Sequence, residues 1–224
     1  MSEPRLLFLV RHARSDQTSR AVTETPRGPQ WDPPLDDVGR RQAELLARRL
    51  LLMDPQPAVV YCSTMRRARQ TVAPYASRCA AGVRFDDDLI EANVGAWEAM
   101  SFEEIVASDE EILHRFRDQD AVWQYAPGAE GIEALRMRVR GAIEGILARH
   151  RDGNIVVVAH GGVINAYVGE VLGLDQEMFF LPENTSLNTL IVDGSRRRVR
   201  FLNDDRHLVQ PELFAPDGAS GRAP

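Results

Sequence analysis

Cysteine is scarce in this sequence, and its scarcity limits the kinds of protein the chain can be. Only Cys62 and Cys79 are present among 224 residues. Two thiols cannot build a framework of disulfides, and neither cysteine has the paired spacing of a zinc site. We therefore expect two buried thiols and no metal centre.

Long hydrophobic runs are also missing. No apolar stretch approaches the roughly 18 residues that a membrane span needs, and the start of the chain lacks the pattern of a secretory signal peptide. Hydrophobic residues make up 44% of the chain and charged residues 27%, a composition typical of a soluble globular protein. We expect a cytoplasmic protein that does not associate with membranes.

Positive charge is not concentrated in any one run. The formal net charge is −6, and the arginines are scattered through segments of helical periodicity. This distribution argues against nucleic acid as a partner, because nucleic-acid surfaces are usually basic patches or stripes. An anionic ligand would have to find its positive charge inside a local pocket.

Apolar segments rich in β-branched residues alternate with segments of helical spacing. The former predict strands at about 5–10, 58–62, 83–86, 154–159, 187–193 and 198–202. The latter predict helices at about 36–53, 67–79, 102–116, 131–150 and 162–172. The alternation indicates an α/β fold, a three-layer α/β/α sandwich around a mostly parallel six-stranded sheet.

The ends of two predicted helices and two irregular segments complete this description. Asp36 is suited to the N-cap of the first helix, and Gly173 to a left-handed C-cap after 162–172. The segment 19–34 contains four prolines and is expected to be a long loop. Residues 211–224 are expected to form a flexible C-terminal tail.

Two histidines directly follow predicted strands. Arg11 and His12 come after the first strand, and His160 follows 154–159 with Gly161 and Gly162 behind it. Ligands of open α/β sheets bind at the carboxyl ends of the strands. Glycines let a ligand approach the backbone, and the helix that follows directs free N–H groups at an anion. These residues predict a binding site for a phosphate-like anion.

Two further strand ends supply arginines and an acid. Residues 63–71 include Arg67 among several arginines, and guanidinium groups match phosphate oxygens in pairs. Glu91 follows the weak strand at 83–86 and could donate a proton. Each such residue alone is more often a surface or turn residue. Their shared position after strands favours a function.

The order of these motifs resembles that of the histidine phosphatase superfamily, which includes the phosphoglycerate mutases. Arg11, His12 and Ala13 are similar to the family's Arg-His-Gly motif, and residues 63–71 to its Ser-Pro-Leu-x-Arg-Ala-x-x-Thr segment. Residues 158–162 resemble its second histidine motif, and 203–208 its usual ending. The resemblance implies a phosphoglycerate mutase-like domain over residues 1–210, with a small helical cap inserted at 98–128.

The same resemblance implies a catalytic role for each of five residues. His12 would be the nucleophile that transiently carries the phosphoryl group. Arg11, Arg67 and His160 would bind the phosphate, and Glu91 would protonate the leaving oxygen. The implied reaction is hydrolysis of a small phosphomonoester through a phosphohistidine, with no metal and no other cofactor.

Three more residues are candidates for contact with the phosphate group. They are Ser15, Thr18 and Gly161, of which Thr18 stands where the family often has an asparagine. The cap segment 98–120 carries eight acidic residues against two arginines, which would disfavour polyanionic substrates if the cap overhangs the site. A homodimer is compatible with the sequence.

Two other functions remain open on the sequence alone. A mutase would return the phosphoryl group to a product, but residues 19–34 lack the Phe-Thr-Gly-Trp-like stretch that resembling mutases carry. A noncatalytic phospholigand-binding protein would be expected to lack a nucleophile or an acid, and His12 and Glu91 are both present. We therefore favour a hydrolase.

Overall fold

The computed structural model describes residues 4–79, 82–108, 111–118 and 122–215. Within these residues, a central six-stranded sheet has the order β5-β4-β6-β1-β7-β8. Its strands are β1 (Arg5–Arg11), β4 (Val59–Ser63), β5 (Val83–Asp86), β6 (Ile155–Ala159), β7 (Leu187–Asp193) and β8 (Arg196–Asp204). Strands β5, β4, β6 and β1 are parallel, whereas β7 is antiparallel to both of its neighbours. The predicted mostly parallel sheet is confirmed.

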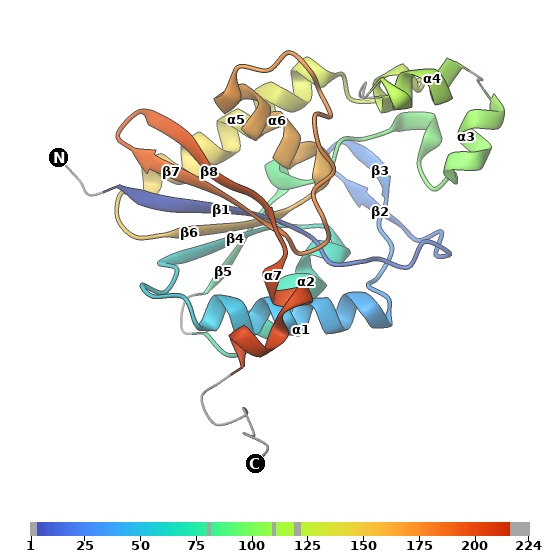
Figure 1. The fold of residues 1–224 in the computed structure, drawn as a ribbon. Helices are drawn as coiled ribbons and strands as arrows, with labels where there is room; N and C mark the ends of the chain where they lie inside the picture. The colour runs from blue at the N-terminus through green and yellow to red at the C-terminus, as the bar shows by residue number, and fades with distance from the viewer. Residues whose placement is uncertain (1–3, 80–81, 109–110, 119–121, 216–224) are drawn as a thin grey trace.

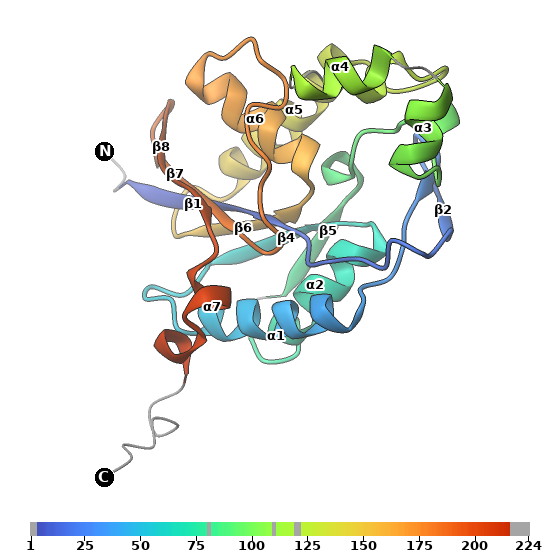
Figure 2. The ribbon, with the colours of Figure 1, turned by 45° about the vertical axis from the view of Figure 1, so that its right-hand side comes forward.

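Helices cover both faces of this sheet, as the three-layer prediction requires (Figure 1). One face carries α1 (Asp37–Leu51), α2 (Arg66–Ala76) and the short α7 (Arg206–Val209). The other face carries α5 (Ile132–Arg149) and α6 (Gly161–Leu172). Two short helices, α3 (Phe102–Ser108) and α4 (Glu111–Arg117), lie beyond the carboxyl ends of the parallel strands (Figure 2). Short 3-10 turns occupy Asp87–Leu89, Gly95–Trp97, Val122–Tyr125 and Pro211–Phe214.

Alternate residues of the strands fill the cores on opposite faces of the sheet. Leu7 and Leu9 of β1 pack with residues of α5 and α6, whereas Phe8 and Val10 pack with residues of α1 and α2. Successive strand side chains point to opposite faces, so a strand covered on both sides is apolar throughout. Cys62 is buried in this core as expected, but Cys79 is only half-buried.

The helix ends follow the capping signals in the sequence. The side chain of Asp36 accepts a hydrogen bond from the N–H of Gly39 at 2.7 Å, which fixes the start of α1. Gly173 ends α6 with φ +68°, a left-handed conformation that glycine adopts without steric cost. Helix α2 ends at Ala76, two residues after Pro74 and three residues before the predicted end.

The prediction of a long loop at 19–34 is wrong, because part of this segment forms strands. It contains an antiparallel hairpin of β2 (Val22–Thr25) and β3 (Gly28–Trp31). Each strand has four residues and β3 contains Pro29, so neither shows the alternation by which strands are recognised. The hairpin is attached to the segment that follows β5, because the N–H of Trp31 donates to the carboxylate of Glu98 at 2.6 Å.

The predicted tail begins in a helical turn rather than in irregular chain. In the turn Pro211–Phe214, the ring of Phe214 lies 5.2 Å from the guanidinium carbon of Arg49 and 6.5 Å from the ring of His207. The remainder of the predicted tail, 216–224, lies outside the described residues. None of the helices described here is long and apolar enough to cross a membrane.

Candidate active site

His12 lies just beyond the end of β1, and its ring is held by the backbone of the next residue. The Nδ1 atom is 2.8 Å from the carbonyl oxygen of Ala13. A carbonyl oxygen can only accept, so Nδ1 carries the proton and Nε2 keeps its lone pair. Burial, followed by the nearby Arg67 and Arg11, holds the pKa of His12 well below its ordinary value of 6.5. The neutral ring therefore has one nucleophilic nitrogen.

His160 follows β6 and faces His12 across the same crevice. The two ring centroids are 5.2 Å apart, with the planes tilted by 55°. Its Nε2 lies 2.8 Å from the hydroxyl oxygen of Ser63, and its buried Nδ1 has no partner among the described residues. Burial, then Arg67, His12 and Arg11, lowers the pKa of His160 well below 6.5. The structure thus brings together the two histidines that lie 148 positions apart in the sequence.

Arg67 reaches the site from the first turn of α2. Its side chain is nearly buried and donates to the carbonyl of Trp31 at 2.8 Å. It also lies 3.4 Å from the carboxylate of Asp32, a residue that is 1% exposed. Asp32 accepts the N–H of Arg66 at 2.7 Å, so one carboxylate fixes both the helix start and the Arg67 guanidinium. Asp32 is not among the site residues predicted from the sequence, because it lies in the segment predicted to be a loop.

Arg11 is the last residue of β1, directly before His12. One of its terminal nitrogens donates to the carbonyl of Pro182 at 2.6 Å. Its buried Nε has no partner within the part of the chain that the structure describes. A Cβ atom on Gly161 would lie 3.9 Å from this Nε, which places the start of α6 beside the guanidinium. Arg11, Gly161 and the helix N-terminus together form positive surroundings for an anion.

Glu91 faces the start of α6 and is fixed by two backbone N–H groups. Its Oε1 accepts from Ala92 at 3.0 Å, and its Oε2 accepts from Gly162 at 3.1 Å. Glu91, Arg11, Gly161 and Gly162 all line one cavity of about 250 Å³. The carboxyl group therefore shares this cavity with Arg11 and Gly161, two of the residues predicted to contact phosphate.

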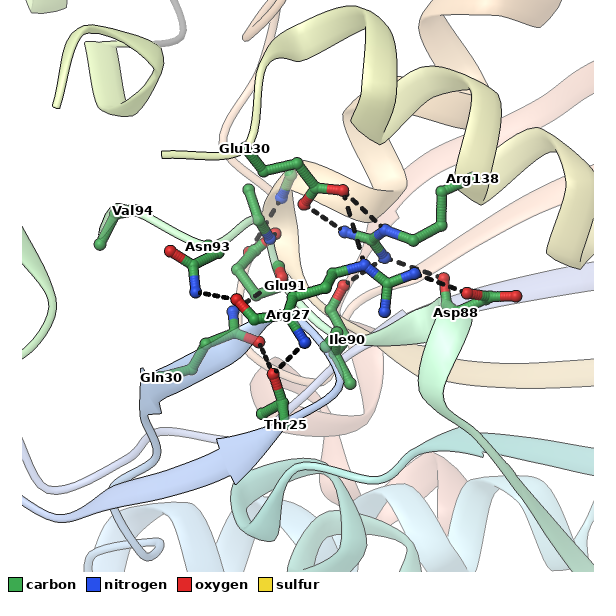
Figure 3. A network of polar contacts seen from close by, with 12 residues as sticks. Thr25, Arg27, Gln30, Asp88, Ile90, Glu91, Asn93, Val94, Glu130 and Arg138 are labelled. Atoms are coloured by element: carbon green, nitrogen blue, oxygen red, sulfur yellow. Dashed lines mark hydrogen bonds and ion pairs between the residues drawn. The ribbon is translucent and has the colours of Figure 1, made fainter. Parts of the chain in front are cut away.

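A network of polar side chains holds the backbone around Glu91 (Figure 3). The amide of Gln30, on β3, donates to the carbonyl of Glu91 at 3.0 Å. Arg138, on α5, donates to the carbonyl of Ile90 at 2.9 Å and pairs with Glu130 at 2.6 Å. The hairpin and a helix thus fix the carbonyl groups of the two peptide bonds on either side of the Glu91 Cα atom.

Ser15 and Thr18 lie on the loop after His12, with their polar groups engaged locally. The Ser15 hydroxyl oxygen accepts from the amide of Gln17 at 3.2 Å, and the residue is buried. The Thr18 hydroxyl donates to the carboxylate of Asp16 at 2.7 Å, on an exposed turn. Contact between either residue and a phosphate stays a prediction.

Two acids of the predicted cap segment are paired with groups outside it. The carboxylate of Glu98 turns inward, accepting the N–H groups of Trp31 and Val94 at 2.6 and 2.8 Å, and burial raises the pKa of Glu98. Glu104 pairs with Arg20 at 3.3 Å. Three of the eight acids lie outside the described residues: Asp109, Glu110 and Asp120. Among the residues the structure describes, no group of three His, Cys, Asp or Glu side chains is placed to hold a metal ion.

One known protein family matches most of this chain. The histidine phosphatase superfamily (branch 1) matches residues 7–205. Phosphoserine phosphatase 1 of Hydrogenobacter thermophilus is 30% identical over 204 residues, which are 90% of this chain and 93% of that protein. The metal-independent phosphoserine phosphatase of Arabidopsis thaliana is 28% identical over 92% of this chain and 84% of that protein.

Solved structures share the same architecture. Bacillus stearothermophilus YhfR aligns with a TM-score of 0.79 at 24% identity, over 91% of this chain and 99% of that one. Mycobacterial glucosyl-3-phosphoglycerate phosphatase aligns with a TM-score of 0.76 at 26% identity, over 90% of this chain and 100% of that one. The chain therefore belongs to the histidine phosphatase superfamily, and its fold is that of the phosphoglycerate mutase-like proteins.

Proposed function

We propose that this protein is a metal-independent hydrolase of a small phosphomonoester, acting through a phosphohistidine on His12. The observation that carries the proposal is the orientation of the His12 ring. The carbonyl of Ala13 lies 2.8 Å from Nδ1, which leaves Nε2 with its lone pair. The ring centroid is 5.2 Å from that of His160, and burial with the charges of Arg67 and Arg11 lowers the pKa of His12. The names of related proteins, phosphoserine phosphatases among them, support a small phosphorylated substrate.

In the first half of the reaction, Nε2 of His12 attacks phosphorus while the bond to the ester oxygen breaks. Arg11, Arg67 and His160 bind the nonbridging oxygens, whose charge must be balanced as the phosphoryl group moves. Glu91 donates its proton to the leaving oxygen. The products of this half are a free alcohol and phosphorylated His12.

In the second half, a water molecule replaces the departed alcohol. The Glu91 carboxylate takes a proton from this water as its oxygen attacks phosphorus and the bond to Nε2 breaks. Inorganic phosphate leaves, and His12 and Glu91 return to their initial protonation states. Two easier displacements thus replace one difficult displacement.

Removing the nucleophile tests the reaction. We expect the wild type to release phosphate from an aryl phosphate in the presence of a chelator, and His12→Ala to be slower by at least about 10³-fold. The matched control is His114→Ala, which removes an exposed histidine of α4 and should retain activity. Undiminished activity of His12→Ala would rule out the proposed mechanism.

The protonation state of His12 can be measured directly. Because burial and two arginines lower its pKa, we expect the ring to stay neutral, with its proton on Nδ1, as the pH falls from about 7 to about 6. Nitrogen NMR of histidine-labelled protein reports both the tautomer and the titration midpoint, with His12→Ala giving the assignment. A midpoint at or above 6.5, or a proton on Nε2, would contradict this geometry.

A further inference from the structure

The cavity that contains Glu91 does not end at the reacting groups. Beyond Arg11 and Glu91, its walls include Trp123, Met178 and Leu181. A second cavity, of about 480 Å³, is lined by the same three side chains. Because the two cavities share these walls, they adjoin each other.

The walls of the second cavity are almost wholly apolar. To the three shared side chains it adds Phe116, Val122 and Phe180. Among its described lining residues the one charged group is Arg117. In the first cavity, the charged lining residues are Arg11 and Glu91, both assigned to the reaction itself.

Several of these apolar side chains are also exposed. Leu181 is 65% exposed and Phe116 is 47% exposed. Exposed apolar side chains that line a cavity favour binding of an apolar group, because covering them removes apolar area from water. Among the lining residues that the structure describes, the second cavity has no carboxylate for the ammonium group of an amino acid and no set of amides or hydroxyls for a sugar.

We propose that these adjoining cavities bind the leaving group of the substrate, and that this leaving group is an apolar alcohol. The inference rests on the proposed function, because Glu91 protonates the leaving oxygen and therefore directs the alcohol into the cavity it lines. The preferred substrates are then phosphate esters of alkyl or arylalkyl alcohols. Esters of polyols and of hydroxy amino acids are poorer substrates.

A chain-length series of esters tests the substrate class. Ethyl, butyl and hexyl phosphate have leaving alcohols of similar basicity, so differences between them report binding rather than leaving-group chemistry. We expect kcat/KM to rise by up to about fourfold per methylene until the cavity is filled, from the transfer free energy of a buried methylene. Glycerol 3-phosphate and phosphoserine should fall below butyl phosphate. A flat series, or phosphoserine as the best substrate, would overturn the inference.

Variants of the apolar walls locate the effect. Phe116→Ser and Leu181→Ser should reduce the ratio of kcat/KM between hexyl and ethyl phosphate. Met137→Ser is the matched control, because Met137 is 69% exposed on α5 and lines neither cavity. A ratio unchanged in both cavity variants would contradict the assignment of these cavities.

The failure of this inference is distinguishable from failure of the proposed function. Phosphate released from every ester without regard to chain length would leave the hydrolase in place and refute the apolar subsite. No phosphate released from any ester, by a protein shown to be folded, would refute the hydrolase and the subsite with it.

Discussion

The two glycines after His160 differ in what surrounds them. A Cβ atom on Gly161 would lie 3.9 Å from Nε of Arg11, an ordinary van der Waals distance. A Cβ atom on Gly162 would lie 2.5 Å from Oε1 of Glu91, which is too close. The carboxylate is anchored by backbone N–H groups, so it cannot move away without losing hydrogen bonds. Gly162 therefore sets the position of the proposed acid.

Gly162→Ala should consequently act as a partial loss of the acid. With an alkyl phosphate we expect kcat to decrease by up to about 10²-fold. This is the lower end of what general acid catalysis contributes. With 4-nitrophenyl phosphate, whose leaving group needs little protonation, the decrease should be much smaller. Gly161→Ala is the matched control and should show no such dependence on the leaving group. Equal losses of Gly162→Ala on both esters would mean that Glu91 is not displaced, or is not the acid.

The buried strands of the sheet could be predicted from the sequence, whereas the hairpin β2–β3 could not. Strands buried on both faces are recognisable as apolar runs, and His12 and His160 could be placed because each follows such a run. The hairpin β2–β3 could not be predicted, because its strands are short and contain a proline. Gln30 and Asp32 were missed for that reason. Each acts on a site residue distant in sequence, through contacts that only the folded chain reveals.

Gln30 is the residue through which this hairpin is expected to affect catalysis. The side chain is 1% exposed and donates to the carbonyl of Glu91, so Gln30→Ala should loosen the acid without touching the substrate. We expect kcat to fall by about tenfold to 10²-fold on an alkyl phosphate, with KM little changed. Glu24→Ala, on the exposed side of the same hairpin, should leave kcat unaltered. A change confined to stability would show that Gln30 is only structural.

Helix α7, near the C-terminus, contacts the loop that supports the proposed active site. His207 of α7 is fully buried between Arg49 of α1 and the loop before β7, where its Nε2 lies 3.0 Å from the hydroxyl of Thr185. The N–H of Thr185 donates to the carbonyl of Arg11 at 3.0 Å, and the amide of Asn184 donates to the carbonyl of His12 at 2.9 Å. Helix α7 thus supports, through Thr185, the backbone that presents the proposed nucleophile.

This buried histidine makes stability depend on pH. Burial, together with Arg49, lowers the pKa of His207 to about 4 in the folded protein from 6.5. Above pH 6.5 the ring is neutral in both states, and as the pH falls toward 4 the unfolded chain gains a proton that the folded chain does not.

The free energy of unfolding should therefore decrease over this interval, by up to about 3 kcal/mol from this residue alone. His207→Gln cannot titrate, so the stability difference between wild type and variant should be largest near neutral pH and shrink toward pH 4. Urea unfolding of both proteins at several pH values measures that difference, in which the contributions of all other groups cancel. A difference that stays constant with pH would show that His207 has the same pKa in the folded and unfolded chain, and that burial and Arg49 do not lower it.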